Sequence, residues 1–107
     1  MTDQTPVTID PAALVADLGA RGRDAQRQLA RSTDAEKAEA LRAAARAIRA
    51  NADEILAANA LDIASGEKNG LGPAMLDRLR LDAGRLSGIA DAVDQVASLP
   101  DPVGQVI

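Results

Sequence analysis

The chain has 107 residues, of which 47% are hydrophobic, and it contains no aromatic residue, no histidine and no cysteine. These absences exclude a thiolate nucleophile, an imidazole base and the usual zinc ligands from the sequence. The net charge of −4 argues against non-specific nucleic-acid binding, and no apolar run approaches the roughly 20 residues that span a bilayer. The first residues lack the basic and apolar regions of a signal peptide, so we expect a soluble, cytoplasmic protein.

The hydrophobic residues predict only a small core. About half of them are alanine, which favours helices but buries little surface. A fully buried Leu, Ile or Val contributes roughly 1.5–3 kcal/mol, whereas ordering the backbone costs roughly 1–2 kcal/mol per residue. We therefore expect one small domain at most, which is loosely packed or oligomeric when it is isolated.

Residues 1–10 are polar and lightly acidic, and we expect them to form a flexible extension. A helix is expected to start at Asp10 and Pro11, because Asp is a good N-cap and Pro is favoured at the first helical position. Gly19 and Gly22 weaken this helix by about 1 kcal/mol each relative to alanine. Its apolar residues share one face: Leu14, Leu18, Ala25 and Leu29.

A second helical region follows, and residues 33–36 (Thr-Asp-Ala-Glu) have the pattern of a capping box at its start. One helix over residues 33–65 would be about 50 Å long. Asn51 opens a weaker N-cap pattern in the middle of this region, so we predict a break into two helices near Asn51. The second helix is expected to end at Gly66 and to bury four residues: Ile55, Leu56, Asn59 and Ile63.

Turn signals at residues 69–70 (Asn-Gly) and 72–73 (Gly-Pro) flank a short predicted helix over residues 73–79. Asp82 is expected to cap a last helix, which Pro100 ends. Its apolar positions recur at steps of three and four: Leu86, Ile89, Val93 and Val96. The pattern predicts an all-α fold of four to five helices over residues 11–99. The β-branched residues that follow predict that residues 100–107 begin the first strand of a truncated sheet.

Three arginines, Arg42, Arg46 and Arg49, share one face of a predicted helix. Such a patch could bind phosphate or nucleic acid, with salt-sensitive affinity. The interpretation that we favour is a solvated face, in which Glu39 supports the helix through weak ion pairs.

Asn59 and Asp62 lie one turn apart within an apolar segment. A buried amide must be satisfied, so Asn59 is expected to tie its helix to a neighbouring backbone. A catalytic role would need a partner group that the sequence does not offer.

The remaining motifs predict structure rather than chemistry. Gly66, Gly70 and Gly72 lack the G-x-G-x-x-G spacing, and we interpret them as turn and cap glycines. The pairs Asp77–Arg78 and Asp82–Arg85 are interpreted as local surface charges. We therefore predict no catalytic, cofactor-binding or metal-binding residue in this chain.

Four short blocks occur in a characteristic order: residues 55–62 (ILAANALD), 69–79 (NGLGPAMLDRL), 85–90 (RLSGIA) and 99–104 (LPDPVG). In this order and spacing, residues 33–107 resemble the N-terminal part of the γ-glutamyl phosphate reductases, also called glutamate-5-semialdehyde dehydrogenases, of the aldehyde dehydrogenase superfamily. The resemblance implies a longer α/β parent enzyme. Its Rossmann-type NADPH-binding domain, catalytic cysteine and oligomerisation flap would all follow residue 107.

The resemblance implies that the parent reduces γ-glutamyl phosphate to glutamate 5-semialdehyde in proline biosynthesis, through a cysteine thioester and hydride transfer from NADPH. The leading helices would pack against the cofactor domain, and this chain alone would be inactive. Its partners would be the rest of the polypeptide and further copies in a homo-oligomer, without nucleic acid or membrane. The alternative from the residues alone is a stand-alone helical interaction or oligomerisation module without catalysis.

Overall fold

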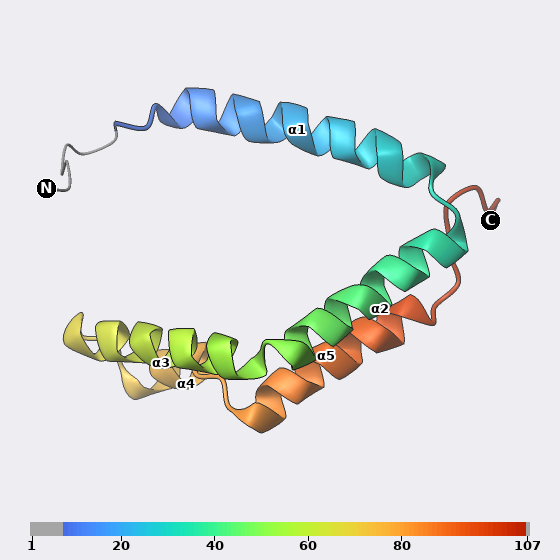
Figure 1. Cartoon of the computed structure of the whole chain (residues 1–107). Coiled ribbons are helices and arrows are strands. Elements are labelled where there is room, and N and C mark those ends of the chain that lie inside the picture. The colour runs from blue at the N-terminus through green and yellow to red at the C-terminus, as the bar shows by residue number, and fades with distance from the viewer. Residues whose placement is uncertain (1–7, 107) are drawn as a thin grey trace, which may run out of the picture. The chain divides into compact units, whose positions relative to one another are not determined.

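The computed structural model describes residues 8–106, and within this range it contains five α-helices and no strand. In chain order the helices are α1 (Pro11–Arg31), α2 (Asp34–Ala50), α3 (Ala52–Lys68), α4 (Pro73–Leu79) and α5 (Ala83–Ala97) (Figure 1). The all-α prediction is therefore confirmed. The chain divides into two units, and the larger unit comprises residues 34–102 with α2 to α5.

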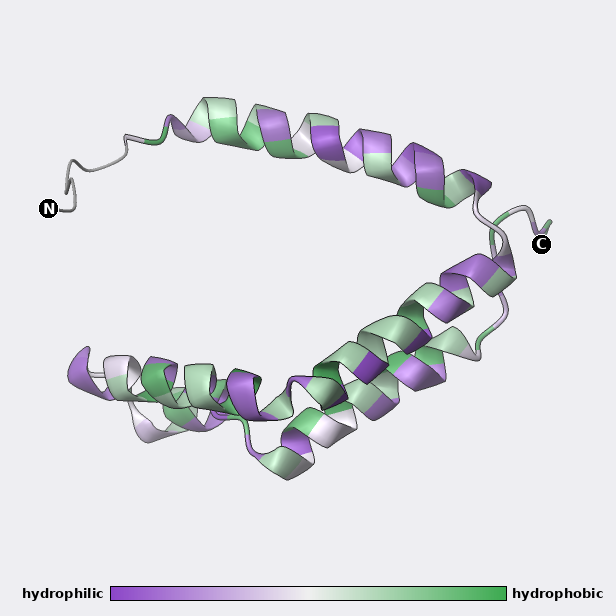
Figure 2. Cartoon of the chain, in the orientation of Figure 1, coloured by the Kyte–Doolittle hydropathy of each residue, from purple (hydrophilic) through white to green (hydrophobic). Residues whose placement is uncertain are grey.

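Helix α1 starts where the sequence predicts. The Asp10 carboxylate accepts a hydrogen bond from the Ala12 backbone N–H at 3.1 Å, and Pro11 is the first helical residue. None of the residues of α1 is buried, so its predicted apolar face stays exposed. Figure 2 shows hydrophobic and hydrophilic residues along the whole of this helix. Residues 1–7 of the expected N-terminal extension lie outside the described residues.

The predicted break near Asn51 is confirmed, and Asn51 is the N-cap residue of α3, as predicted. Its side chain makes no cap bond to α3, however, and its amide nitrogen donates to the Ala47 carbonyl at 2.8 Å. The backbone bonds continue through the junction: the N–H of Asn51 donates to Ala47, and the N–H of Ile55 donates to Asn51, both at 3.0 Å. The junction is therefore a change of helix direction at one residue rather than a loop (Figure 1).

Helix α3 continues to Lys68, beyond the predicted end at Gly66. It ends in a Schellman motif, in which the N–H of Gly70 donates to the Glu67 carbonyl and the N–H of Leu71 to the Gly66 carbonyl. Gly70 has a φ of 81°, which favours glycine. A Cβ atom at Gly66 would lie 2.9 Å from Leu71 Cδ1. Gly70 is therefore the cap glycine, whereas Gly66 makes room for Leu71.

Helices α2 and α5 lie side by side (Figure 1). They are antiparallel, because residues 34–42 face residues 97–100 and residues 48–52 face residues 83–87. Ala45 of α2 and Ala90 of α5 are fully buried, which lets the two helices approach closely. The predicted apolar face of α5 is only partly correct: Leu86 is buried, but Ile89 and Val96 are 44% and 51% exposed.

The boundaries of α4 and the start of α5 agree with the prediction. Helix α4 spans the predicted residues 73–79, and the Asp82 carboxylate caps α5 by accepting a hydrogen bond from the Arg85 N–H at 2.7 Å. Residues 100–106 form coil and a turn. A strand requires a partner strand, and residues 8–106 provide none. The strand expected over residues 100–107 stays a prediction about a longer polypeptide, and Ile107 lies outside the described residues.

Candidate functional site

The buried amide of Asn59 joins α3 to the connection between α4 and α5. Its side-chain nitrogen donates to the Leu79 carbonyl at 2.9 Å, and its oxygen accepts from the Leu81 N–H at 2.8 Å. Asn59 is only 9% exposed. The two hydrogen bonds give both polar atoms of its side chain a backbone partner, as a buried amide requires. This geometry confirms the predicted structural tie, and Asp62 is exposed one turn further along α3.

The guanidinium of Arg85 holds the end of α4. Its Nη1 donates to the Asp77 carbonyl at 2.6 Å and to the Arg80 carbonyl at 2.9 Å, and its Nη2 pairs with the Asp77 carboxylate at 2.9 Å. The carbonyls at the end of a helix have no intrahelical partner, and the fork of donors on arginine satisfies two of them here. All four residues are exposed, as predicted for surface charges, but the partners differ from the expected ones. Asp77 pairs with Arg85 rather than with Arg78, and Asp82 caps the Arg85 backbone N–H.

Two of the three arginines on α2 are engaged by carboxylates. Arg46 Nη2 lies 2.7 Å from Glu39 Oε1. The hydrogen bond from Arg46, followed by its charge, lowers the pKa of Glu39, and the charge of Arg42 adds to this effect. Both paired side chains are 62% exposed, so the pair is a surface pair of small energetic weight.

Arg49 connects α2 to α5. Its Nη2 lies 2.8 Å from carboxylate oxygens of both Asp91 and Asp94. These two hydrogen bonds raise the pKa of Arg49, so its charge is held by two carboxylates of its own chain. An arginine engaged in this way is poorly placed to bind phosphate, and the geometry supports the interpretation of a solvated face.

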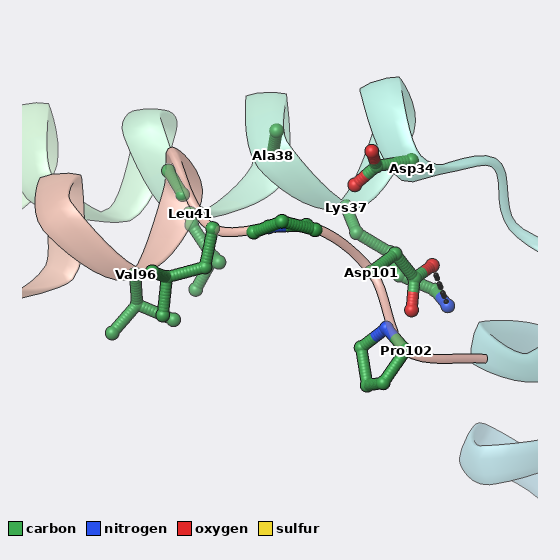
Figure 3. A pocket seen from close by; sticks show the side chains of 10 residues that line it. Asp34, Lys37, Ala38, Leu41, Val96, Asp101 and Pro102 are labelled. Atoms are coloured by element: carbon green, nitrogen blue, oxygen red, sulfur yellow. Dashed lines mark hydrogen bonds and ion pairs between the residues drawn. The ribbon is translucent and has the colours of Figure 1, made fainter. Parts of the chain in front are cut away.

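A hollow of about 220 Å³ lies between α2 and the segment that follows α5 (Figure 3). Its polar feature is an ion pair, with Lys37 Nζ 2.8 Å from Asp101 Oδ2. The two side chains are 22% and 17% exposed. In the ion pairs Arg49–Asp94 and Arg85–Asp77 of the same unit, both side chains are at least 40% exposed. Leu41 and Val96 line the apolar side of the hollow. No local pattern predicts this pair, because 64 residues separate its two members.

The hollow has the chemistry of an anchor rather than of an active site. Ten residues line it, and Asp34 is the only ionisable residue among them besides the pair. Catalysis would need a nucleophile with its base, or donors for a developing negative charge, close together. The ion pair instead links α2 to the chain beyond α5.

The described part of the chain holds no cluster of three or more residues that could bind a metal ion. Gly70 and Gly72 lie between two helices, and no strand precedes them within residues 8–106, as a dinucleotide-binding loop requires. Over the same range, no helix has both the length and the hydropathy needed to cross a membrane. The fold and its polar contacts define a helical module in which Lys37, Arg49 and Arg85 each join one element to another segment.

No family model matches the sequence. Individual curated proteins match it well. The chain is 62% identical over 98 residues to a gamma-glutamyl phosphate reductase of Sphingopyxis alaskensis. It is 59% identical over 104 residues to one from Novosphingobium aromaticivorans and 55% identical over 103 residues to one from Rhizorhabdus wittichii. The chain is thus similar over almost its whole length to proteins named gamma-glutamyl phosphate reductase, which confirms the predicted resemblance.

These alignments cover almost all of this chain but only part of each relative. For the first relative they include 92% of this chain and 23% of the reductase, and for the third 96% and 24%. The chain therefore spans about a quarter of the length of the curated relatives that it matches.

Proposed function

We propose that the chain is a helical, non-catalytic part of an NADPH-dependent reductase that converts γ-glutamyl phosphate to glutamate 5-semialdehyde in proline biosynthesis. The observation that carries this proposal is the 62% identity, over 92% of the chain, to a protein named gamma-glutamyl phosphate reductase. The contacts of Asn59, Arg85 and Lys37 support a structural role, because each joins one helical element to another segment.

In this proposal, the catalytic cysteine and the NADPH site belong to polypeptide outside this chain. The sequence contains no cysteine, and the glycines of the α3–α4 connection do not fit a phosphate-binding loop. NADPH would supply the hydride for the reduction. The residues of this chain would stabilise the domain that binds it. A cytoplasmic location and a homo-oligomeric assembly of the whole reductase are part of the same proposal.

A chimera tests this function. The chain replaces the matching segment of the Sphingopyxis alaskensis reductase, and a deletion of that segment serves as the control. The assay follows NADPH formation in the reverse direction, from glutamate 5-semialdehyde, phosphate and NADP⁺. We expect activity from the chimera and none from the deletion variant or from the isolated chain. A soluble chimera without activity would refute the proposal.

A second candidate is a stand-alone interaction module, which the exposed apolar residues of α1 favour: Leu14, Val15, Leu18 and Leu29. A 21-residue helix without a buried residue has little to stabilise it except association with another surface. Sedimentation velocity over a range of concentrations tests this candidate. A chain that remains monomeric and binds no partner would count against it.

A further inference from the structure

The connection between α3 and α4 contains an asparagine followed by a glycine, Asn69 and Gly70, and both residues are exposed. The chain has three asparagines, and the other two, Asn51 and Asn59, are each followed by alanine. The side-chain amides of Asn51 and Asn59 donate to backbone carbonyls at 2.8 and 2.9 Å. Over residues 8–106, no hydrogen bond holds the side-chain amide of Asn69. Asn69 therefore differs from the other asparagines in the residue that follows it and in the freedom of its amide.

The side-chain amide of an exposed asparagine can be attacked by the backbone nitrogen of the next residue. Hydroxide from the solvent removes the proton of the Gly70 N–H, and this nitrogen forms a bond to Cγ of Asn69. The bond between Cγ and Nδ2 breaks, and ammonia leaves after taking a proton from water. Water then opens the resulting succinimide ring at either of its carbonyls, which gives aspartate or isoaspartate. Glycine favours the attack, because it has no Cβ to hinder its nitrogen, and nothing lies within 4 Å of the place where a Cβ of Gly70 would stand.

We propose that Asn69 is a site of spontaneous deamidation, and that opening of the C-terminal end of α3 controls the rate. In the closed Schellman motif, the N–H of Gly70 donates to the Glu67 carbonyl at 3.1 Å, which holds the proton that must leave. Asn69 has a ψ of 7°, which turns the Gly70 nitrogen away from the Asn69 Cβ, whereas ring closure needs the two to be eclipsed. The reaction therefore starts from a locally open state in which the Schellman motif is broken.

The products of deamidation oppose closure of the same motif. Isoaspartate adds a methylene group to the main chain before Gly70, which shifts Gly70 and Leu71 out of register with the carbonyls of α3 that they bond. Either product also places a carboxylate beside the C-terminus of α3, where the helix dipole disfavours negative charge. Deamidation thus makes a transient opening of α3 permanent. The reaction needs only residues of this chain and water, so it goes beyond the proposed function and does not depend on it.

The test is incubation of the 107-residue chain in warm, mildly alkaline buffer, followed by peptide mass spectrometry. We expect Asn69 to gain one mass unit, while Asn51 and Asn59 stay intact. A synthetic peptide of residues 65–74 is too short to hold the helix end closed. It should deamidate faster than the folded chain by about tenfold or more, since two backbone hydrogen bonds close the motif in the chain. Asn69→Gln should abolish the gain at this position, because the longer side chain does not form the same ring.

Leu71→Ala tests whether opening of α3 controls the rate. A Cβ atom at Gly66 would lie 2.9 Å from Leu71 Cδ1, so the Leu71 side chain packs on α3 and helps to close its end. The matched control is Leu61→Ala, because Leu61 is an aliphatic residue of α3 that is 73% exposed. We expect Leu71→Ala to speed the deamidation of Asn69 several-fold and Leu61→Ala to leave it unchanged. Circular dichroism checks that both variants keep their helix content.

Three outcomes contradict different parts of the proposal. An Asn69 that stays intact while the peptide is converted would overturn the site. Equal rates in the chain and the peptide, or in Leu71→Ala and Leu61→Ala, would overturn the control by the end of α3. Conversion of Asn51 as fast as that of Asn69 would show that exposure alone decides, and would overturn the role of Gly70.

Discussion

Replacing Asn59 by alanine should destabilise the unit formed by α2 to α5 more than any other single truncation of a polar side chain on α3. The substitution removes two hydrogen bonds at once, to the Leu79 carbonyl and the Leu81 N–H. Each such bond contributes about 0.5–1.5 kcal/mol, and a buried group left without a partner costs about 1–3 kcal/mol. Asn59 also lines a hollow of about 260 Å³, through which water can reach the freed backbone groups. We therefore expect a loss at the lower end of the combined range, about 2–3 kcal/mol.

The measurement is urea unfolding of the 107-residue chain, followed by far-UV circular dichroism. Asp62→Ala is the matched control, because Asp62 lies one turn away on α3 and is exposed. We expect the control to change the free energy of unfolding by less than about 0.5 kcal/mol. If Asn59→Ala and Asp62→Ala differed by less than that amount, the view of Asn59 as the tie between α3 and the α4–α5 connection would be refuted.

Three further predictions test the contacts of the same structure. Arg85→Lys should lower the free energy of unfolding by about 1 kcal/mol, because one ammonium cannot replace a guanidinium that bonds two carbonyls and a carboxylate. The control is Arg78→Lys. Equal effects of the two substitutions would contradict this role of Arg85. The hydrogen bond and charge of Arg46, with the charge of Arg42, lower the pKa of Glu39 in the folded chain below its ordinary value. Its contribution to stability is therefore present above the pKa of the unfolded chain and is lost as the pH falls through the folded pKa. Urea unfolding of Glu39→Gln should therefore differ from wild type at pH 7 and converge with it in acid, and a difference independent of pH would contradict the assignment. Gly19→Ala should increase helix content by circular dichroism, since nothing lies within 4 Å of the added Cβ and alanine is favoured in a helix by about 1 kcal/mol. Gly66→Ala should give a smaller gain in helix content or none, because its Cβ would lie 2.9 and 3.2 Å from two leucine side chains. Equal gains at Gly19 and Gly66 would argue against close packing around Gly66.

The sequence by itself determined where most helices begin and end. Asp10 and Asp82 cap their helices as predicted, and residues 73–79 form the short helix that their flanking turn signals indicate. Each of these signals acts through hydrogen bonds between residues two to four positions apart, so a local pattern is sufficient to predict them. Asn59 was also predictable as a structural tie, because a polar amide within an apolar helical segment must be satisfied.

Only the tertiary structure decided which partners those elements take. The amide of Asn59 could have met any neighbouring backbone, and only the fold brings the residues around position 80 to it. Lys37 pairs with Asp101 across 64 residues, and the buried contact between α2 and α5 uses Ala45 and Ala90 rather than the larger residues of the predicted face. Helical periodicity states which residues share a face but not which of two apolar faces meets a neighbour. That choice depends on how closely two helix surfaces fit, which is a property of both surfaces together.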